Sequence, residues 1–376
     1  MRVASHPWLP VAAAVAFHLG LLAVYLPAFH GDLSALVCVG QERIGAPPYE
    51  AVRVGFVTGG FDGQFYYAIA RNPWTWHRAV LDVPAYRHVR LLYPALAWAL
   101  SGGGNAYRLF WALPLVNLAA IGGLAWLGAR LARHYGVNVW WGFLLPLAVN
   151  DGMPLLRDLT DPLATFAVCG LLASWLLGGR WHHLALWSAA ALFAREQNAA
   201  IVLVVLAAAG WTGRYRTVAG ICAVLALWGG WIGLLHAGYG EWPLLPRSDY
   251  FFGSPFKGMW YRWTHLGVSG SRVSAGLHLI RMTLLTAHCG LALYLAARTP
   301  DRVVAWMAVG GVALAVLTGW ASYEDAWSYT RVFVWIPLAV WLAGVRLRRT
   351  RPIWLLAPAS LWPLVSVVTA WHTWRT

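Results

Sequence analysis

Charged residues are scarce in this 376-residue chain. Asp, Glu, Lys and Arg make up 11% of it, whereas 60% is hydrophobic and the mean hydropathy is +0.56. Soluble domains usually carry about 25% charged residues, and a soluble protein could not bury so large an apolar fraction. The composition therefore excludes a soluble enzyme, a disordered chain and a DNA-binding domain. Several apolar runs are long enough to cross a bilayer, so we expect an all-α polytopic membrane protein.

Lysine and cysteine are also rare. Lys257 stands beside 27 Arg, and the four cysteines share no short spacing, so neither a disulfide framework nor a zinc site is predicted. The net charge of +14 does not indicate a nucleic-acid partner, because many arginines occupy short gaps between apolar runs. That distribution is typical of the positive-inside rule. These arginines are Arg130, Arg133, Arg180, Arg214, Arg216, Arg298, Arg302, Arg346, Arg348, Arg349 and Arg351.

The apolar runs predict about eleven membrane spans within a single transmembrane domain, residues 1–376. The first run is too long for a signal-peptide core and no cleavage site follows it, so we expect an uncleaved helix. The run at 89–102 is too short to cross and predicts an interfacial or re-entrant helix. We expect two long extracytoplasmic loops, 30–105 with interfacial helices and 239–275. The expected spans are 8–29, 106–128, 137–150, 160–178, 182–195, 197–211, 217–238, 276–297, 303–320, 332–346 and 352–371.

The segment 182–211 fits either one tilted helix or two short helices broken within the polar run 195–198. Two helices place all the arginine clusters on the cytoplasmic side, so the positive-inside rule favours the break. With Met1 inside, only Asp301 among the 14 acidic residues falls on the cytoplasmic side. Both long loops then lie outside, and long loops in a compact protein are usually functional. We therefore expect the chemistry at the extracytoplasmic surface.

One polar constellation surrounds Asp62. Phe61, Phe65 and Ile69 recur every four residues, which predicts a helix lying on the membrane surface. Asp62 then shares the neighbouring face with Tyr66, and a carboxylate at this position can serve as a general base. The alternative is that Asp62 only caps the helix by accepting hydrogen bonds from backbone N–H groups.

Two arginines follow in the same loop. Arg87 and Arg90 are three residues apart, which places both on one helical face with Tyr86 or Tyr93 nearby. Two guanidinium forks on one face suit a phosphate or pyrophosphate group. The alternative is a pair of interfacial arginines that touch lipid headgroups.

A third polar run lies before the expected span at 160–178. Asp161 precedes Pro162, an order that indicates a helix N-cap followed by the first helical residue. Arg157 and Asp158 have no such explanation. They form either a local ion pair or part of a site.

The fourth polar run interrupts about thirty mostly apolar residues. Arg195, Glu196 and Gln197 stand within it, and ionisable groups inside membrane spans are functional candidates by default. The alternative is an internal Arg195–Glu196 pair. Two weaker groups are an aromatic loop at 249–263 and a short outer loop with Tyr323, Glu324, Asp325 and Arg331.

The chain resembles GT-C superfamily integral-membrane glycosyltransferases at two motifs, Phe61-Asp62-Gly63-Gln64-Phe65-Tyr66-Tyr67 and Arg90-x-x-Tyr93-Pro94. These motifs resemble the aspartate-centred segment of mannosyltransferases that act in GPI-anchor assembly. They also resemble that segment in bacterial relatives tied to cell-surface glycopolymers. The segments 157–162 and 195–197 look similar to later signatures of the bacterial group.

This resemblance implies a multi-helix fold with a large first outer loop, a polyprenyl-phosphate sugar as donor, and an aspartate of that loop as the base. The acceptor is then a glycan, lipid or protein, and the site lies on the extracytoplasmic side of the bacterial cytoplasmic membrane. Many relatives carry the acidic residue directly after the first helix, where this chain has Asp32. Asp62 and Asp32 therefore compete for the role of base, and we favour Asp62.

The remaining polar residues receive binding roles on the same interpretation. Arginines near the membrane surface would bind the donor phosphate, namely Arg87, Arg90, Arg157 and Arg195. Other substrate contacts are expected from Gln64, Tyr66, Tyr93, Asp158, Asp161, Glu196 and Gln197.

No cofactor is expected. A divalent metal near Asp32 and Asp62 is an open alternative, but the sequence shows no clear ligand spacing for it. The main rival is a non-catalytic transporter or flippase of lipid-linked sugars, which would use similar cations and aromatic residues but no base. A non-enzymatic assembly partner is the second rival.

Overall fold

The computed structural model describes residues 6–57, 59–244, 253–266, 272–324 and 331–373. The described chain is mostly helical, as expected of an all-α protein. Its strands are two residues each: β1 (Val39–Gly40) pairs in parallel with β2 (Gly55–Phe56). Part of the expected aromatic loop at 249–263 lies outside the described residues, and so does Asp325.

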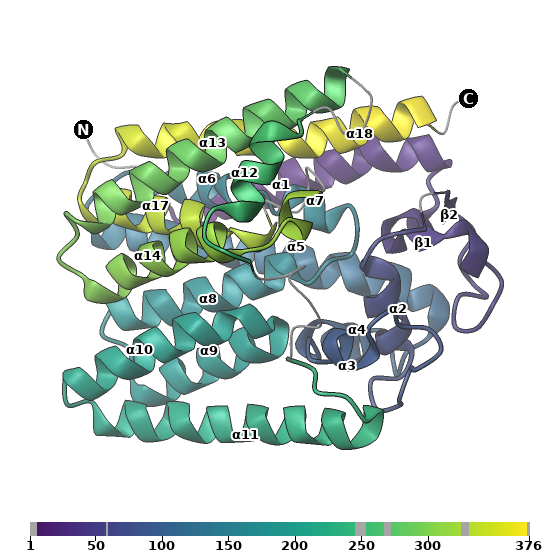
Figure 1. Ribbon diagram of the computed structural model, residues 1–376, viewed down its shortest axis with the longest axis horizontal. Helices are drawn as coiled ribbons and strands as arrows, with labels where there is room; N and C mark the ends of the chain where they lie inside the picture. The colour runs from purple at the N-terminus through teal and green to yellow at the C-terminus, as the bar shows by residue number, and fades with distance from the viewer. Residues whose placement is uncertain (1–5, 58, 245–252, 267–271, 325–330, 374–376) are drawn as a thin grey trace.

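The expected first outer loop folds into short helices around these two strands. They are η2 (Leu33–Val37), η3 (Gln41–Arg43), α2 (Gly63–Arg71), α3 (Pro84–His88) and α4 (Leu92–Leu100), and η1 (Leu26–Phe29) precedes them. Figure 1 shows α2, α3, α4 and the strands gathered at one side of the view, beside the ends of the longer helices. The helix expected within 89–102 is present as α4, which buries Tyr93 and Ala97 and exposes Leu96 and Leu100.

The rest of the described chain forms the helix bundle. Its elements are α1 (Trp8–Tyr25), α5 (Ala106–His134), α6 (Trp141–Ala148), α7 (Gly152–Leu155), α8 (Asp161–Leu176), α9 (Trp181–Ala194), η4 (Glu196–Asn198), α10 (Ala199–Trp211), α11 (Tyr215–Tyr239), α12 (Lys257–Thr264), α13 (Arg272–Ala296), α14 (Arg302–Leu317), α15 (Ala321–Glu324), α17 (Trp335–Arg346), η5 (Arg351–Leu361) and α18 (Trp362–Thr373).

Within the described residues, five segments are long and apolar enough to cross a membrane: Trp8–Phe29, Ala106–His134, Tyr215–Tyr239, Ala275–Ala296 and Arg351–Val368. These segments support an integral membrane protein, but the count of eleven spans is not confirmed. Crossing the hydrocarbon core takes about 20 helical residues, and α8, α10, α14 and α17 have only 12 to 16. The expected span at 137–150 contains only the eight-residue α6, which ends just before Asn150 adopts a positive φ of 61°.

The segment 182–211 consists of two helices, α9 and α10, as the positive-inside rule favoured. Helix α9 ends at Ala194, and Arg195 takes an extended backbone conformation with φ −161° and ψ 127° before η4 begins. The break orients Arg195 and Glu196 toward charged partners on other elements. In Figure 1, α8, α9, α10 and α11 lie side by side in the lower half of the view.

The two ends of this bundle differ in chemistry. At one end, arginines that follow or precede helices pack on aromatic residues: the Arg214 guanidinium lies 4.6 Å from the Trp175 ring, and Arg346 donates to the Tyr135 hydroxyl at 2.7 Å. Asp161 begins α8 at the opposite end, whereas Trp175 lies in its last turn. The arginines at this end therefore contact aromatic side chains, whereas Arg195 and Arg331 near Asp161 pair with carboxylates.

Helix α2 differs from the expected helix on the membrane surface, because residues 63–70 are all buried. Its aromatic residues pack inward: the Tyr67 ring stacks on Phe110 of α5, and Tyr66 meets Tyr93 of α4 edge to face. A Cβ atom on Gly63 would collide with the backbone oxygens of residues 37 and 157. Glycine thus lets the start of α2 lie directly against the chain that leads into α8.

Candidate functional site

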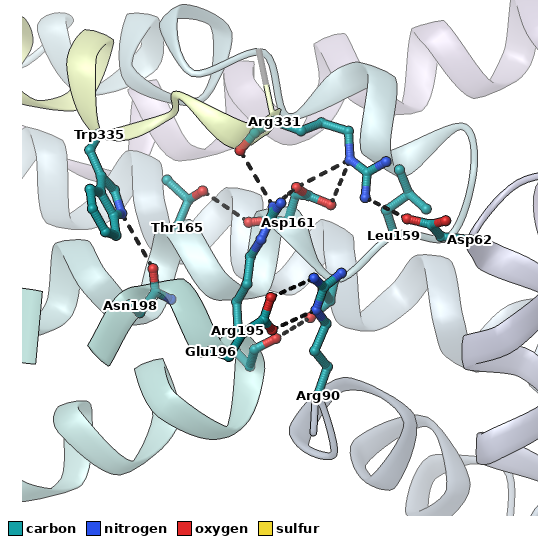
Figure 2. Close-up of polar contacts among 12 residues, drawn as sticks. Asp62, Arg90, Leu159, Asp161, Thr165, Arg195, Glu196, Asn198, Arg331 and Trp335 are labelled. Carbon is teal, nitrogen blue, oxygen red and sulfur yellow. Dashed lines mark hydrogen bonds and ion pairs between the residues drawn. The ribbon is translucent and has the colours of Figure 1, made fainter. Parts of the chain in front are cut away.

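Charged side chains from four separate segments meet at the end of the bundle that faces the first loop. Figure 2 shows Asp62, Asp161, Arg195, Glu196 and Arg331 directed toward one another, with Arg90 reaching in from the loop. We call this group, together with Asp82 and Arg87, the charge network. Carboxylates and guanidiniums alternate within it, so each charge has an opposite neighbour.

Asp62 lies where the loop meets the bundle. Its Oδ1 is 3.1 Å from a terminal nitrogen of Arg87, and its Oδ2 accepts a hydrogen bond from Arg331 at 2.9 Å. Asp62 occupies the N-cap position of α2, yet its side chain makes no capping hydrogen bond. The alternative that Asp62 only caps this helix is therefore wrong.

The environment of Asp62 favours its ionised form. Burial opposes ionisation, but the charges of Arg87, Arg331 and Arg90 together outweigh burial and hold the pKa of this carboxyl well below its ordinary value of 3.8. The side chain keeps 22% of its surface exposed. Asp62 is therefore a carboxylate that a ligand can reach and whose two oxygens are both engaged.

Arg87 and Arg90 form their hydrogen-bonded ion pairs with different carboxylates, and their binding of one phosphate stays a prediction. Arg87 forms a bidentate pair with Asp82, with both N···O distances at 2.8 Å. Arg90 forms a bidentate pair with Glu196 at 2.8 and 2.6 Å and also donates to the Tyr66 hydroxyl at 2.8 Å. The alternative of headgroup contact does not hold for Arg90, because its side chain is only 3% exposed.

Asp161 is the most enclosed carboxylate of the charge network. It pairs with Arg195, and its Oδ2 lies 3.3 Å from Nε of Arg331. The N-cap of α8 is Thr160, with Asp161 as the first helical residue, so the expected capping role of Asp161 is wrong. The alternative of an internal Arg195–Glu196 pair is also wrong, because each of the two residues is paired with a different segment.

Asp158 stands apart from the charge network. It is fully buried, and among the described residues neither of its carboxylate oxygens has a hydrogen-bond partner. Burial raises the pKa of Asp158 well above 3.8, which favours the neutral acid. The Arg157 guanidinium lies 3.8 Å from the centre of the Phe61 ring. The structure therefore places Arg157 beside the start of α2 and Asp158 in the packed interior.

Three further residues that were predicted to belong to the site instead form hydrogen bonds with the protein backbone. Gln64 joins the strands by accepting from the Gly40 amide at 3.3 Å and donating to the Gly59 carbonyl at 3.1 Å. Tyr93 is fully buried and donates to the Leu113 carbonyl at 3.1 Å. The Asp32 carboxylate accepts from the Ser34 amide at 2.9 Å and so caps η2. Tyr66, by contrast, contacts the charge network through Arg90.

Arg331 is the residue that sequence reasoning underrated. It joins Asp62 to Asp161, which are 269 and 170 residues away from it in the sequence. Its signal was its place in the short outer loop that also carries Glu324 and Asp325. The partner itself could not be inferred, since no local spacing links these residues.

A narrow pocket adjoins the charge network between α8, η4 and α17. Asp161, Arg195 and Gln197 line its polar side, whereas Val168 and Leu338 line its apolar side. Its free space holds about one water molecule. Gln197 thus lies at the site, although its Nε2 has no hydrogen-bond partner in the described structure.

No family model matches this chain, and no curated protein or solved structure matches it. Among the described residues, no three His, Cys, Asp or Glu side chains come together as metal ligands would. What the geometry offers is an ionised, reachable carboxylate flanked by guanidiniums. Guanidiniums can hold an anionic group, and a carboxylate can take a proton from a hydroxyl once it is freed from such cations.

Proposed function

We propose that this chain is an integral-membrane glycosyltransferase that moves a sugar from a polyprenyl-phosphate donor to an acceptor hydroxyl. The observation that carries the proposal is Asp62, which stays ionised between Arg87 and Arg331 and remains reachable. The GT-C resemblance of the surrounding segment supports the donor class. We place the site on the extracytoplasmic face of a bacterial cytoplasmic membrane, on the strength of the arginine distribution.

The reaction would proceed by one displacement at the anomeric carbon. The acceptor oxygen forms a bond to that carbon while the bond to the donor phosphate oxygen breaks. Asp62 accepts the hydroxyl proton, and the electron pair of the breaking bond leaves on polyprenyl phosphate. Arg87 and Arg331, beside Asp62, would stabilise the charge that grows on the leaving phosphate.

Release of polyprenyl phosphate tests the proposal. Purified protein is supplied with a polyprenyl-phosphate sugar and candidate acceptors from three classes, glycan, lipid and peptide, and the free carrier phosphate is measured. We expect release that depends on the acceptor. Asp62→Asn should lower the rate by about two or more orders of magnitude, because the amide cannot accept the proton.

Asp301→Asn is the matched control. Asp301 caps α14 by accepting from the Val303 and Val304 amides, and asparagine caps helices about as well as aspartate. Its activity should stay at the wild-type level. If wild-type protein in vesicles moves the lipid-linked sugar across the bilayer and releases no carrier phosphate, the flippase interpretation replaces the enzyme.

A further inference from the structure

Both oxygens of Asp62 are engaged, one by each of two guanidiniums. Oδ1 is 3.1 Å from Arg87 and Oδ2 is 2.9 Å from Arg331. A carboxylate held in this way is a weak base, since each cation stabilises the charged form that must be neutralised. In this arrangement Asp62 cannot take a proton from a hydroxyl until at least one arginine moves away from it.

These two ion pairs, together with Asp82, whose side chain is 40% exposed beside Arg87, are the accessible part of the charge network. The side chains of Arg87 and Arg331 are 14% and 18% exposed, and that of Asp62 is 22% exposed. Deeper in the network, Arg90 is 3% exposed and Arg195 is 6% exposed. A ligand that enters from outside would therefore meet Arg87 and Arg331 first, while the inner pairs keep their carboxylates.

Both outer arginines also have a second carboxylate that anchors them. Arg87 is held by Asp82 and Arg331 by Asp161, so either guanidinium can exchange one partner without losing its place. Phosphate oxygens are good replacements for a carboxylate, because guanidinium groups bind both with the same planar hydrogen-bond geometry.

We propose that Arg87 and Arg331 form an exchangeable anion site, in which a phosphate group of the substrate takes the place of the Asp62 carboxylate. The assignment to a substrate phosphate rests on the proposed glycosyltransferase function, whereas the exchange itself does not. Substrate and base then compete for the same two cations. Binding of the phosphate releases Asp62, and the base becomes available only when the donor is present.

The charges around Asp62 are consistent with release of the carboxylate when a phosphate binds. Arg87, Arg90 and Arg331 favour the charged form of Asp62. The Asp82 carboxylate lies close enough to oppose that form, and so does the Tyr66 hydroxyl when it is itself ionised. A phosphate bound to Arg87 and Arg331 would cancel part of the cationic charge. The pKa of Asp62 should then rise toward its ordinary range, which makes it a better proton acceptor.

Direct binding of phosphate tests the exchange without an activity assay. Inorganic phosphate and polyprenyl phosphate are titrated into the purified full-length protein in a detergent with an uncharged headgroup. Arg331→Gln should weaken binding of both by about tenfold or more, because one of the two cations is lost. Arg298→Gln, which removes a cation stacked 4.0 Å from the Tyr294 ring, should bind both as wild type does.

The decisive variant is Asp62→Asn. An amide competes poorly for guanidiniums, so this variant should bind inorganic phosphate about tenfold more tightly than wild type. Glu42→Gln removes the same charge from an exposed side chain of the same loop and should change the affinity much less. Melting curves of each variant in the same detergent show that it is folded.

Unchanged phosphate affinity in both Arg331→Gln and Asp62→Asn would overturn the exchange, even if sugar transfer is observed. Equal tightening in Asp62→Asn and Glu42→Gln would also overturn it, because the effect would then be general electrostatics. Tight binding of polyprenyl phosphate without any sugar transfer would keep the exchange and remove the glycosyltransferase. Equal competition by phosphatidylglycerol would overturn the assignment to a substrate and assign the anion site to bilayer headgroups.

Discussion

Arg195 and Asp161 form the ion pair of the charge network in which both partners are deeply buried. Both side chains are only 6% exposed, so each depends on the other to offset the loss of hydration. Arg195→Gln should lower the free energy of unfolding by about 3 kcal/mol, since Asp161 keeps only the longer contacts to Arg331 among the described cations. Thermal or denaturant unfolding in detergent measures this change.

Glu42→Gln is the matched comparison for that loss. Glu42 pairs with Arg43 at 3.5 Å, but its side chain is 58% exposed, and exposed pairs contribute about 0–1 kcal/mol. Arg195→Gln should therefore lower the free energy of unfolding clearly more than Glu42→Gln does. Equal stability of Arg195→Gln and wild type would show that the inner pair is solvated and that the network is looser than described.

The depressed pKa of Asp62 also predicts how stability depends on pH. A group whose pKa is lower in the folded state binds fewer protons when folded, so its contribution is complete above about pH 4 and is lost as the pH falls through the folded pKa. Wild-type protein should lose stability on acidification below about pH 4. Asp62→Asn should show a shallower slope over that range, and an identical slope would show that Asp62 does not contribute.

At the scale of elements, the contact between α2 and the chain before α8 depends on Gly63. Gly63→Ala would place a Cβ against backbone oxygens that cannot rotate away, so the start of α2 must shift. We expect a loss of about 1–3 kcal/mol and slower sugar transfer, because Asp62 precedes Gly63 directly. Stability in detergent and release of carrier phosphate are the two measurements.

Gly210→Ala is the control for this substitution. Gly210 lies in α10 with open space around its Cα, and alanine favours helix over glycine by about 1 kcal/mol. It should leave stability unchanged or raise it slightly. A Gly63→Ala variant as stable and active as Gly210→Ala would mean that α2 is not held in place by this contact.

Sequence patterns predicted the secondary-structure elements better than they predicted the side-chain contacts between them. The break at 195–198 followed from the distribution of arginines, and α4 followed from the length of its apolar run. The surface position of α2 was wrong because the four-residue period of its apolar residues does not reveal that the intervening tyrosines pack inward as well. The span count was uncertain because several bundle helices are shorter than the apolar runs that contain them.

The charge network shows the same limit at the level of the site. Most of its acidic and basic members were selected individually, but the Arg195–Glu196 pair that short spacing offered as an alternative does not form. Charged side chains in an apolar environment seek any opposite charge in reach, and chain folding brought partners from distant segments. Local spacing therefore indicates which residues matter but not which residues they contact.

For the whole molecule, the arginines in the short gaps between apolar runs predict the topology. A cysteine introduced at position 50 in the first loop should react with a membrane-impermeant thiol reagent in intact cells, whereas one at position 349 should not. The exposed Cys222 is first changed to serine, and the other native cysteines are buried. Labelling at 349 and protection at 50 would reverse the orientation.

The long-range contact of Arg331 with Asp62 has a consequence for biosynthesis. Asp62 leaves the ribosome 269 residues before Arg331, which corresponds to roughly 10–50 s at ordinary rates of translation. During that interval the first loop carries a carboxylate that lacks one of its two cations. The site can therefore assemble only after Arg331 has been synthesised. A nascent chain arrested before residue 331 would carry the motif around Asp62 without the complete site.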